Sequence, residues 1–159
     1  VSVNQINLSA TARESEFAFQ AAHAGVDCVS YWRNEKATEY TSQSASTPNP
    51  VINCFGESPV TSTKTRVRTV TGTGSVDRYL NTFQWGTPER CSSVDMYVIN
   101  AYGGTMNEVF ANQAVGNNGT KTCNQGTICT VLMSAGYNRA CSDLGTSIFS
   151  VQRELTVEY

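Results

Sequence analysis

Residues 15–32, SEFAFQAAHAGVDCVSYW, decide the fold of this 159-residue chain. Apolar side chains recur along them at the spacing of one face of a helix with about 3.6 residues per turn, namely Phe17, Ala21, Ala24, Cys28 and Tyr31. The small residues 21–25 allow a sheet or another helix to approach closely. The stretch therefore predicts a helix that is either a core helix of one domain or an element shared with neighbouring subunits.

The same helical pattern begins well before this stretch. It runs from Val3 to about Arg33, with Ile6 and Ala10 on the apolar stripe. A helix of roughly 30 residues is about 45 Å long, which is longer than a domain of this size requires. We therefore expect residues 1 to about 14 to project from the globular body and to pack on something outside this chain.

The composition indicates one folded domain with a small net charge. Hydrophobic residues make up 40% and charged residues 15% of the chain, and the net charge is −2. A chain of this size can bury a substantial core, and this composition is not that of a disordered tail. The small net charge favours neither nucleic acid nor an anionic membrane, and the sequence has no apolar run of about 18 residues that would predict a spanning helix.

The cysteine pattern predicts disulfides. The chain has six cysteines, no CxxC pair and a single histidine, so disulfides in an oxidising compartment are favoured over a zinc site. A bond from Cys28 to Cys54 would close a loop of about 25 residues and stabilise the fold by roughly 3 to 4 kcal/mol. Cys123 and Cys129 flank a tight turn that their own bond would hold.

Beyond the helix, the pattern changes to strands. Residues 34–60 predict an irregular polar connection, and alternating residues predict strands over 61–71, 78–85, 93–101, 128–135 and 149–159, with a loop rich in Gly and Asn between the third and fourth. We expect an α+β fold in which the helix lies on one face of an antiparallel sheet. The domain then consists of a helix (1–33), a connection (34–60) and a sheet with loops (61–159).

One charged residue lies on the apolar face of the last predicted strand. Arg153 shares that face with Val151, Leu155 and Val157, and an unpaired buried arginine is costly. We expect an ion pair with Asp27, or failing that with Glu16 or Glu14. The alternative is that the side chain reaches solvent at the sheet edge.

The first predicted strand carries three cations at alternate positions. Lys64, Arg66 and Arg68 lie on one strand face, and Tyr79 or Trp85 of the next strand could interleave with them. Such a strand is a candidate site for a DNA backbone. The alternative is an edge strand whose charges prevent aggregation.

Enzymatic patterns are absent from the sequence. His23 and Cys28 point about 140° apart around a helix, which does not suit a catalytic pair, and we find no phosphate-binding, calcium or metalloprotease motif. We therefore expect no catalytic activity, no cofactor and no metal.

Two segments resemble one protein family. Residues 14–32, from Glu14 to Trp32, resemble the segment that follows the membrane helix of type IV minor pilins and pilin-like proteins. Residues 134–138, Cys141 and residues 151–155 are similar to the C-terminal strand of those proteins. The resemblance implies a pilin fold, with a long N-terminal helix on a four- or five-stranded antiparallel sheet and a C-terminal loop closed by a disulfide.

The resemblance also implies features of the cysteines and of the N-terminus. Cys28, Cys54, Cys91 and Cys141 match the cysteine positions of the family, and Cys123 and Cys129 look like an extra pair in an insertion. Family members begin with an apolar helical half that anchors them in the membrane. We expect such a segment, which the printed sequence does not contain, ahead of Val1.

The function implied is that of a structural subunit of a type IV pilus, which supports assembly, adhesion, motility or DNA uptake. It would assemble with other pilin subunits through one helix face, made of Ile6, Ala10, Phe17, Ala21 and Ala24. A host or cell surface and DNA are further partners, and the location is an extracellular pilus or the periplasm, with an inner-membrane anchor before assembly. The alternatives are a pseudopilin of a type II secretion system and a free, secreted, disulfide-stabilised adhesin.

Overall fold

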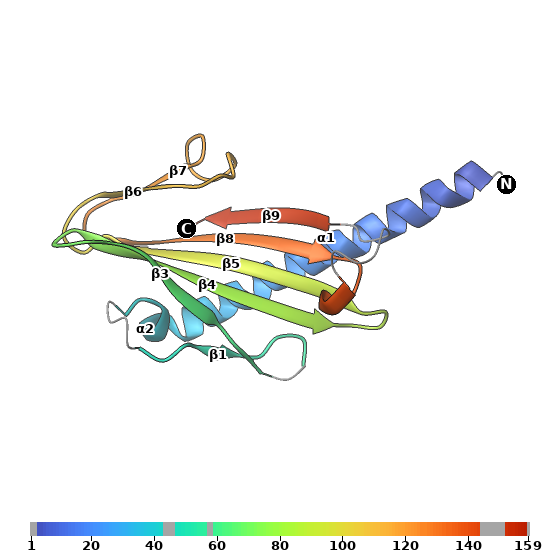
Figure 1. Cartoon of the computed structure of the whole chain (residues 1–159), viewed down its shortest axis with the longest axis horizontal. Coiled ribbons are helices and arrows are strands. Elements are labelled where there is room, and N and C mark those ends of the chain that lie inside the picture. Colours follow the sequence, from blue (N-terminus) through green and yellow to red (C-terminus); the bar gives the residue numbers. More distant parts are fainter. Residues whose placement is uncertain (1–2, 43–46, 57–58, 144–151, 159) are drawn as a thin grey trace.

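The computed structural model describes residues 3–42, 47–56, 59–143 and 152–158, and it describes side chains from residue 12 to residue 143 within those ranges. A single long helix, α1 (Val3–Glu35), opens the chain and lies along one face of a sheet (Figure 1). It contains the helix predicted over residues 3–33. A short helix, α2 (Ala37–Tyr40), follows it directly.

The central sheet is antiparallel, with the strand order β3-β4-β5-β8-β9. Its strands are β3 (Thr63–Val70), β4 (Gly74–Trp85), β5 (Arg90–Asn100), β8 (Ile128–Tyr137) and β9 (Gln152–Glu158). The third predicted strand corresponds to β5 and has a neighbour on each side, as its two apolar faces indicate. A short 3-10 helix, η1 (Cys141–Asp143), follows β8.

Two small sheets form where the sequence predicted only loops. One joins β1 (Val51–Ile52) to β2 (Val60–Thr61), and the other joins β6 (Met106–Val109) to β7 (Thr120–Cys123). The described residues thus form nine strands in three sheets, whereas the predicted pilin fold has one sheet of four or five strands. That prediction is wrong for this chain, because the loop between β5 and β8 pairs with itself and buries Met106 and Cys123.

Small residues bring α1 into direct contact with the central sheet. Ala18, Ala21 and Ala22 are fully buried. A Cβ atom added to Gly136 would lie 2.0 Å from the carbonyl oxygen of Ala18, and one added to Gly25 would lie 2.9 Å from Cγ2 of Val94. The helix backbone therefore packs against the sheet backbone, as the small residues of the opening stretch predicted.

The two faces of the central sheet bury different clusters. The helix face buries the largest side chains of the core, including Tyr79, Met96 and Leu132. On the outer face, β6 and β7 fold back and cover Val76 and Ile99 at one end of the sheet. Side chains toward the other end of this outer face stay partly exposed, for example those of Leu80 and Tyr137.

Candidate functional site

The middle of α1 is fixed to the sheet by hydrogen bonds as well as by packing. The hydroxyl of Ser92 donates to the carbonyl of Ala21 over 2.7 Å, and that of Ser134 donates to the carbonyl of Ala22 over 2.8 Å. Helix carbonyls already accept bonds from within the helix, so these hydroxyls act as additional donors that set the position of α1. The middle of α1 is therefore part of the core.

This arrangement corrects the predicted subunit-packing face. Ala21 is fully buried against the chain's own sheet, and the guanidinium of Arg90 lies 4.7 Å from the centre of the Phe17 ring. Ala24 is partly exposed. Ile6 and Ala10 lie in the helical part of α1 whose side chains are outside the described residues. Phe17 and Ala21 thus serve the domain itself, because their helical face is the one that the sheet covers.

The N-terminal part of α1 extends beyond the sheet (Figure 1). Glu14 accepts a hydrogen bond from the side-chain amide of Asn138, whereas Ala12 and Arg13 are exposed. At the usual rise of a helix, residues 3–13 span about 16 Å. An isolated helix shorter than about 12 residues is marginal in water, so this projecting segment, residues 3–13, has little stability of its own.

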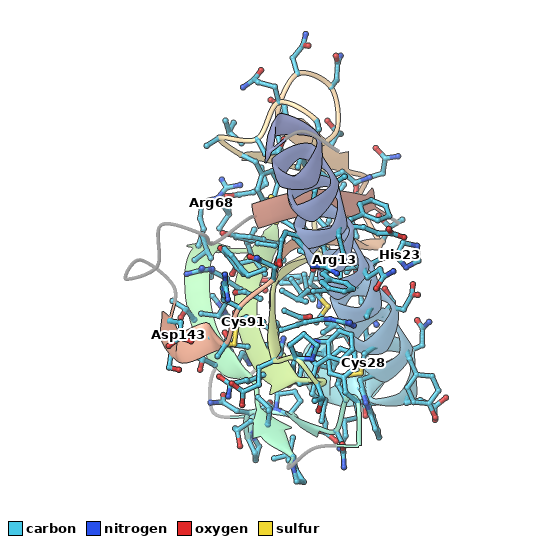
Figure 2. All side chains as sticks on the ribbon, turned by 90° about the vertical axis from the view of Figure 1, so that its right-hand side faces the viewer. Arg13, His23, Cys28, Arg68, Cys91 and Asp143 are labelled. Atoms are coloured by element: carbon cyan, nitrogen blue, oxygen red, sulfur yellow. A yellow bond between two sulfur atoms is a disulfide. The ribbon has the colours of Figure 1, made fainter. Side chains whose placement is uncertain are left out.

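The side of α1 away from the sheet carries aromatic residues. Phe19 is 48% exposed and Tyr31 is 56% exposed, and His23 lies between them on this side (Figure 2). His23 Nδ1 is 3.1 Å from a carboxylate oxygen of Asp27. This surface is a second part of α1 that is free of the domain core.

The contact of Asp27 with His23 corrects the prediction that Asp27 forms a buried ion pair with Arg153. The Asp27 side chain is 68% exposed, so it does not compensate a buried arginine. Arg153 is opposite Gly136 in the register of β9 and β8, and its side chain is outside the described residues. Asp27 is on the solvent side because the residues facing the sheet, Ala22 and Val26, are at other positions around the helix.

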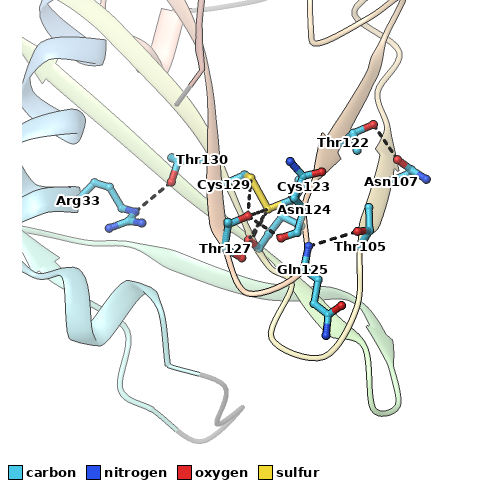
Figure 3. The surroundings of a disulfide bond; sticks show 11 residues. Arg33, Thr105, Asn107, Thr122, Cys123, Asn124, Gln125, Thr127, Cys129 and Thr130 are labelled. Atoms are coloured by element: carbon cyan, nitrogen blue, oxygen red, sulfur yellow. Dashed lines mark hydrogen bonds between the residues drawn. A yellow bond between two sulfur atoms is a disulfide. The ribbon is translucent and has the colours of Figure 1, made fainter.

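All six cysteines form disulfides. The bonds join Cys28 to Cys54, Cys91 to Cys141 and Cys123 to Cys129, so the predicted use of cysteine is confirmed. The Cys123–Cys129 bond closes the turn between β7 and β8, where the hydroxyl of Thr127 also donates to the carbonyl of Asn124 over 2.6 Å (Figure 3). Three disulfides indicate an oxidising, extracellular or periplasmic environment.

The three cations of β3 do not form one patch. The pairing of β3 with β4 shifts between Arg66 and Arg68, and a bulge of one residue turns the following side chains to the other face of a sheet. Arg66 pairs with Asp77, and Arg68 pairs with Glu108 over 2.8 Å on the outer face. The ammonium of Lys64 lies 5.8 Å from the centre of the Tyr79 ring.

The aromatic residues predicted to accompany these cations are also occupied. Tyr79 is fully buried, and Trp85 stacks on Phe55 with ring centres 4.4 Å apart. Neither ring is an open platform for a base. The DNA-binding arrangement predicted from the sequence is therefore not assembled, because the bulge separates the cations and acidic neighbours pair with both arginines.

A cleft that the sequence did not reveal lies on the outer face. It has a volume of about 420 Å³ and lies between β5 and β8 on one side and residues 108–112 on the other. Tyr97 and Phe110 contact edge to face within it, with ring centres 4.9 Å apart. Val67 and Val109 line it and are 44% and 75% exposed. The alternation in residues 93–101 placed Tyr97 on this face, but no pattern in the Gly- and Asn-rich loop predicted Phe110 beside it.

Metal binding and membrane crossing each need a feature that is missing from the part of the chain that the structure describes. Within it, no three His, Cys, Asp or Glu side chains form a group that could hold a metal ion. Among the same residues, no helix has the length and apolarity that crossing a membrane requires.

Comparison with known proteins finds no family model, no curated protein and no solved structure that matches the chain. The resemblance to type IV pilins is therefore corrected and gives no family assignment. The residues that suggested it, such as Ala21, Gly25 and Cys28, are those that any helix needs to pack closely on a sheet and to be cross-linked to the adjoining loop.

Proposed function

We propose that this protein is a structural, non-enzymatic subunit of an assembly outside the cytoplasm, and that it joins the assembly through the projecting segment of α1. The observation that carries the proposal is the length of α1, whose residues 3–13 extend past the sheet (Figure 1). A projecting helix of this length gains stability when an apolar face is buried against a partner, and Ile6 and Ala10 lie on the apolar stripe of this segment.

The chemistry of the described side chains fits a role without catalysis. The six cysteines are oxidised, and the single histidine pairs with Asp27 on the exposed side of α1. Both arginines of β3 pair with carboxylates. The proposal does not rest on the family resemblance, which alone suggested a pilus or a type II secretion apparatus, and it therefore does not specify the assembly.

Hydrogen exchange tests the proposal on the chain in its native envelope fraction and on the purified chain. We expect amides 3–13 to exchange rapidly in the purified chain and at least about 100-fold more slowly in the assembly. The variant Ile6→Glu should leave the assembly, whereas the matched variant Asn4→Glu, about 160° away from Ile6 around the same helical segment, should remain. Equal exchange of amides 3–13 in both samples, with Ile6→Glu retained in the assembly, would refute the proposal.

A second candidate function is a secreted binding domain. The observation that favours it is the cleft on the outer face, which two exposed valines border. In that case the purified chain binds its ligand with the same affinity after removal of residues 1–11, and Ile6→Glu has no effect in any assay.

A further inference from the structure

The size and floor of the outer-face cleft suit a small ligand or a single side chain of a partner. Ligand pockets commonly enclose about 300 to 1,000 Å³, and this cleft encloses about 420 Å³. Tyr97, Phe110 and Met133 give it an apolar floor. Aromatic rings and a methionine together can contact an apolar body of varied shape.

Among the residues whose side chains are described, the two charged ones that line the cleft are both acidic. They are Asp95 and Glu108, and their arginine partners do not line it. Arg78 Nε bonds to Oδ1 of Asp95 over 2.6 Å, and the Arg68 guanidinium bonds to Oε2 of Glu108 over 2.8 Å. Within the part of the chain that is described, the second oxygen of each carboxylate accepts no hydrogen bond.

The two carboxylates affect the aromatic floor. Burial raises the pKa of the Tyr97 hydroxyl above its ordinary value, and the charges of Asp95 and Glu108 raise it further, against the opposing charge of Arg78. Both carboxylates line the same cleft as the Tyr97 ring, where they disfavour a negative charge. The same field favours a positive charge in the cleft, and aromatic rings attract cations through their faces.

We propose that the outer-face cleft binds an organic cation with an apolar body. Its ammonium group lies beside the free oxygens of Asp95 and Glu108, and its body contacts Tyr97, Phe110 and Met133. The chemistry is that of a small aromatic amine or of a lysine side chain next to an apolar residue. This inference concerns the face opposite α1 and is independent of the proposed assembly function.

Three probes of nearly equal size separate charge from apolar contact. We would titrate the isotope-labelled full chain at neutral pH with phenethylammonium, with its neutral analogue 2-phenylethanol and with the anion phenylacetate. We expect saturable amide shifts at Tyr97, Phe110 and Met133, and a dissociation constant about tenfold lower for the amine than for the alcohol. The anion should not saturate. The dipeptide N-acetyl-Phe-Lys-amide, added in a separate arm, shows whether a lysine side chain or the free amine binds more tightly.

Substitutions test whether the two carboxylates cause the preference. Asp95→Asn and Glu108→Gln should each reduce the ratio of amine to alcohol affinity several-fold and leave the alcohol affinity unchanged. Met133→Ala should weaken both probes equally, and Asp143→Asn, in η1 at the other end of the sheet, should change neither (Figure 1).

The titration also has outcomes that would overturn the proposal. One is equal affinity for the amine and the alcohol, and another is a preference for the amine that both Asp95→Asn and Glu108→Gln retain. A third is the absence of saturation for every cation up to about 10 mM. Glu108→Gln keeps the test valid if Asp95→Asn does not fold, because the Arg68–Glu108 pair is at the outer margin of the fold, with the arginine 42% exposed.

Discussion

The two faces of the central sheet are covered in different ways. On the helix face, backbone lies on backbone, because Gly136 and Gly25 have no side chain to hold α1 away. On the outer face, the short pair of β6 and β7 covers only one end, and charged pairs such as Arg78–Asp95 remain partly exposed. The helix face has no space for a larger side chain, and the outer face retains a cleft.

This difference separates stability from binding within one sheet. Changes on the helix face alter the free energy of unfolding, because nothing there can move without displacing α1. Changes on the outer face mainly alter the shape and charge of the cleft, because solvent replaces what is removed. The three predictions below test this separation, starting from the largest effect.

Gly136→Val should destabilise the fold by at least about 4 kcal/mol or prevent folding, since the new side chain meets helix backbone that must then move. The added Cβ would lie 2.0 Å from the carbonyl oxygen of Ala18 and 2.2 Å from the nitrogen of Ala22. Ala135→Val, the neighbouring position on the outer face, is the matched control and should change the free energy of unfolding by less than about 1 kcal/mol. Urea unfolding followed by circular dichroism measures both, and equal effects would contradict the separation of the two faces.

Removing one disulfide on each side should give intermediate losses. Cys28 and Cys54 are separated by 26 residues and Cys123 and Cys129 by 6. On loop entropy, replacing both cysteines by alanine costs about 3.5 kcal/mol for the first bond and about 2.2 kcal/mol for the second. Removal of the Cys28–Cys54 bond should also speed amide exchange at the end of α1 near Tyr31. A larger loss for the second bond would show that the β6–β7 pair, rather than the helix, limits unfolding.

The smallest effect should be a loss of stability at high pH. Burial raises the pKa of Tyr79 and of Tyr40, on the helix face, above the ordinary value of 10.0. Above about pH 10 the unfolded chain loses tyrosine protons that the folded chain retains, so this contribution is complete below that pH and declines as the pH rises. Tyr79→Phe should therefore flatten the decline in unfolding free energy between about pH 9 and pH 11.

Tyr97→Phe on the outer face is the control for that experiment. Burial also raises the pKa of Tyr97, but the Tyr97 side chain is only partly buried. Tyr97→Phe should therefore flatten the alkaline decline in the free energy of unfolding less than Tyr79→Phe does. A larger flattening for Tyr97→Phe than for Tyr79→Phe would show that tyrosine burial on the outer face contributes more to the alkaline decline.

Residue patterns were sufficient for the long elements of the fold. The apolar spacing of Phe17, Ala21 and Ala24 predicted α1 to within two residues at its C-terminal end, and alternation over residues 93–101 predicted most of β5. The pattern could not say what the helix face contacts, because small residues allow a sheet and a neighbouring helix to approach equally well. Gly74 lies between the strands predicted over 61–71 and 78–85, yet it begins β4, where a Cβ would meet the carbonyl of Asn100 at 2.3 Å.

The candidate sites were less predictable because they depend on contacts distant in the sequence. The cleft requires Phe110 to reach Tyr97, and the residues around Phe110 are a loop by composition. The three cations of β3 alternate perfectly in the sequence, and Val67, where the register shifts, is a β-branched residue that suits any strand. Nothing local marks it as the extra residue.

That extra residue in β3 has a consequence for how such a surface changes over time. Deleting Val67 would remove the bulge and leave Arg66 and Arg68 as consecutive residues, which still point to opposite faces of the strand. The bulge thus lets the strand hold one additional residue while both arginines keep their faces of the sheet. A strand of this kind can change in length at the bulge and keep the ion pairs on both of its faces, so a length difference there does not by itself alter the charge of either surface.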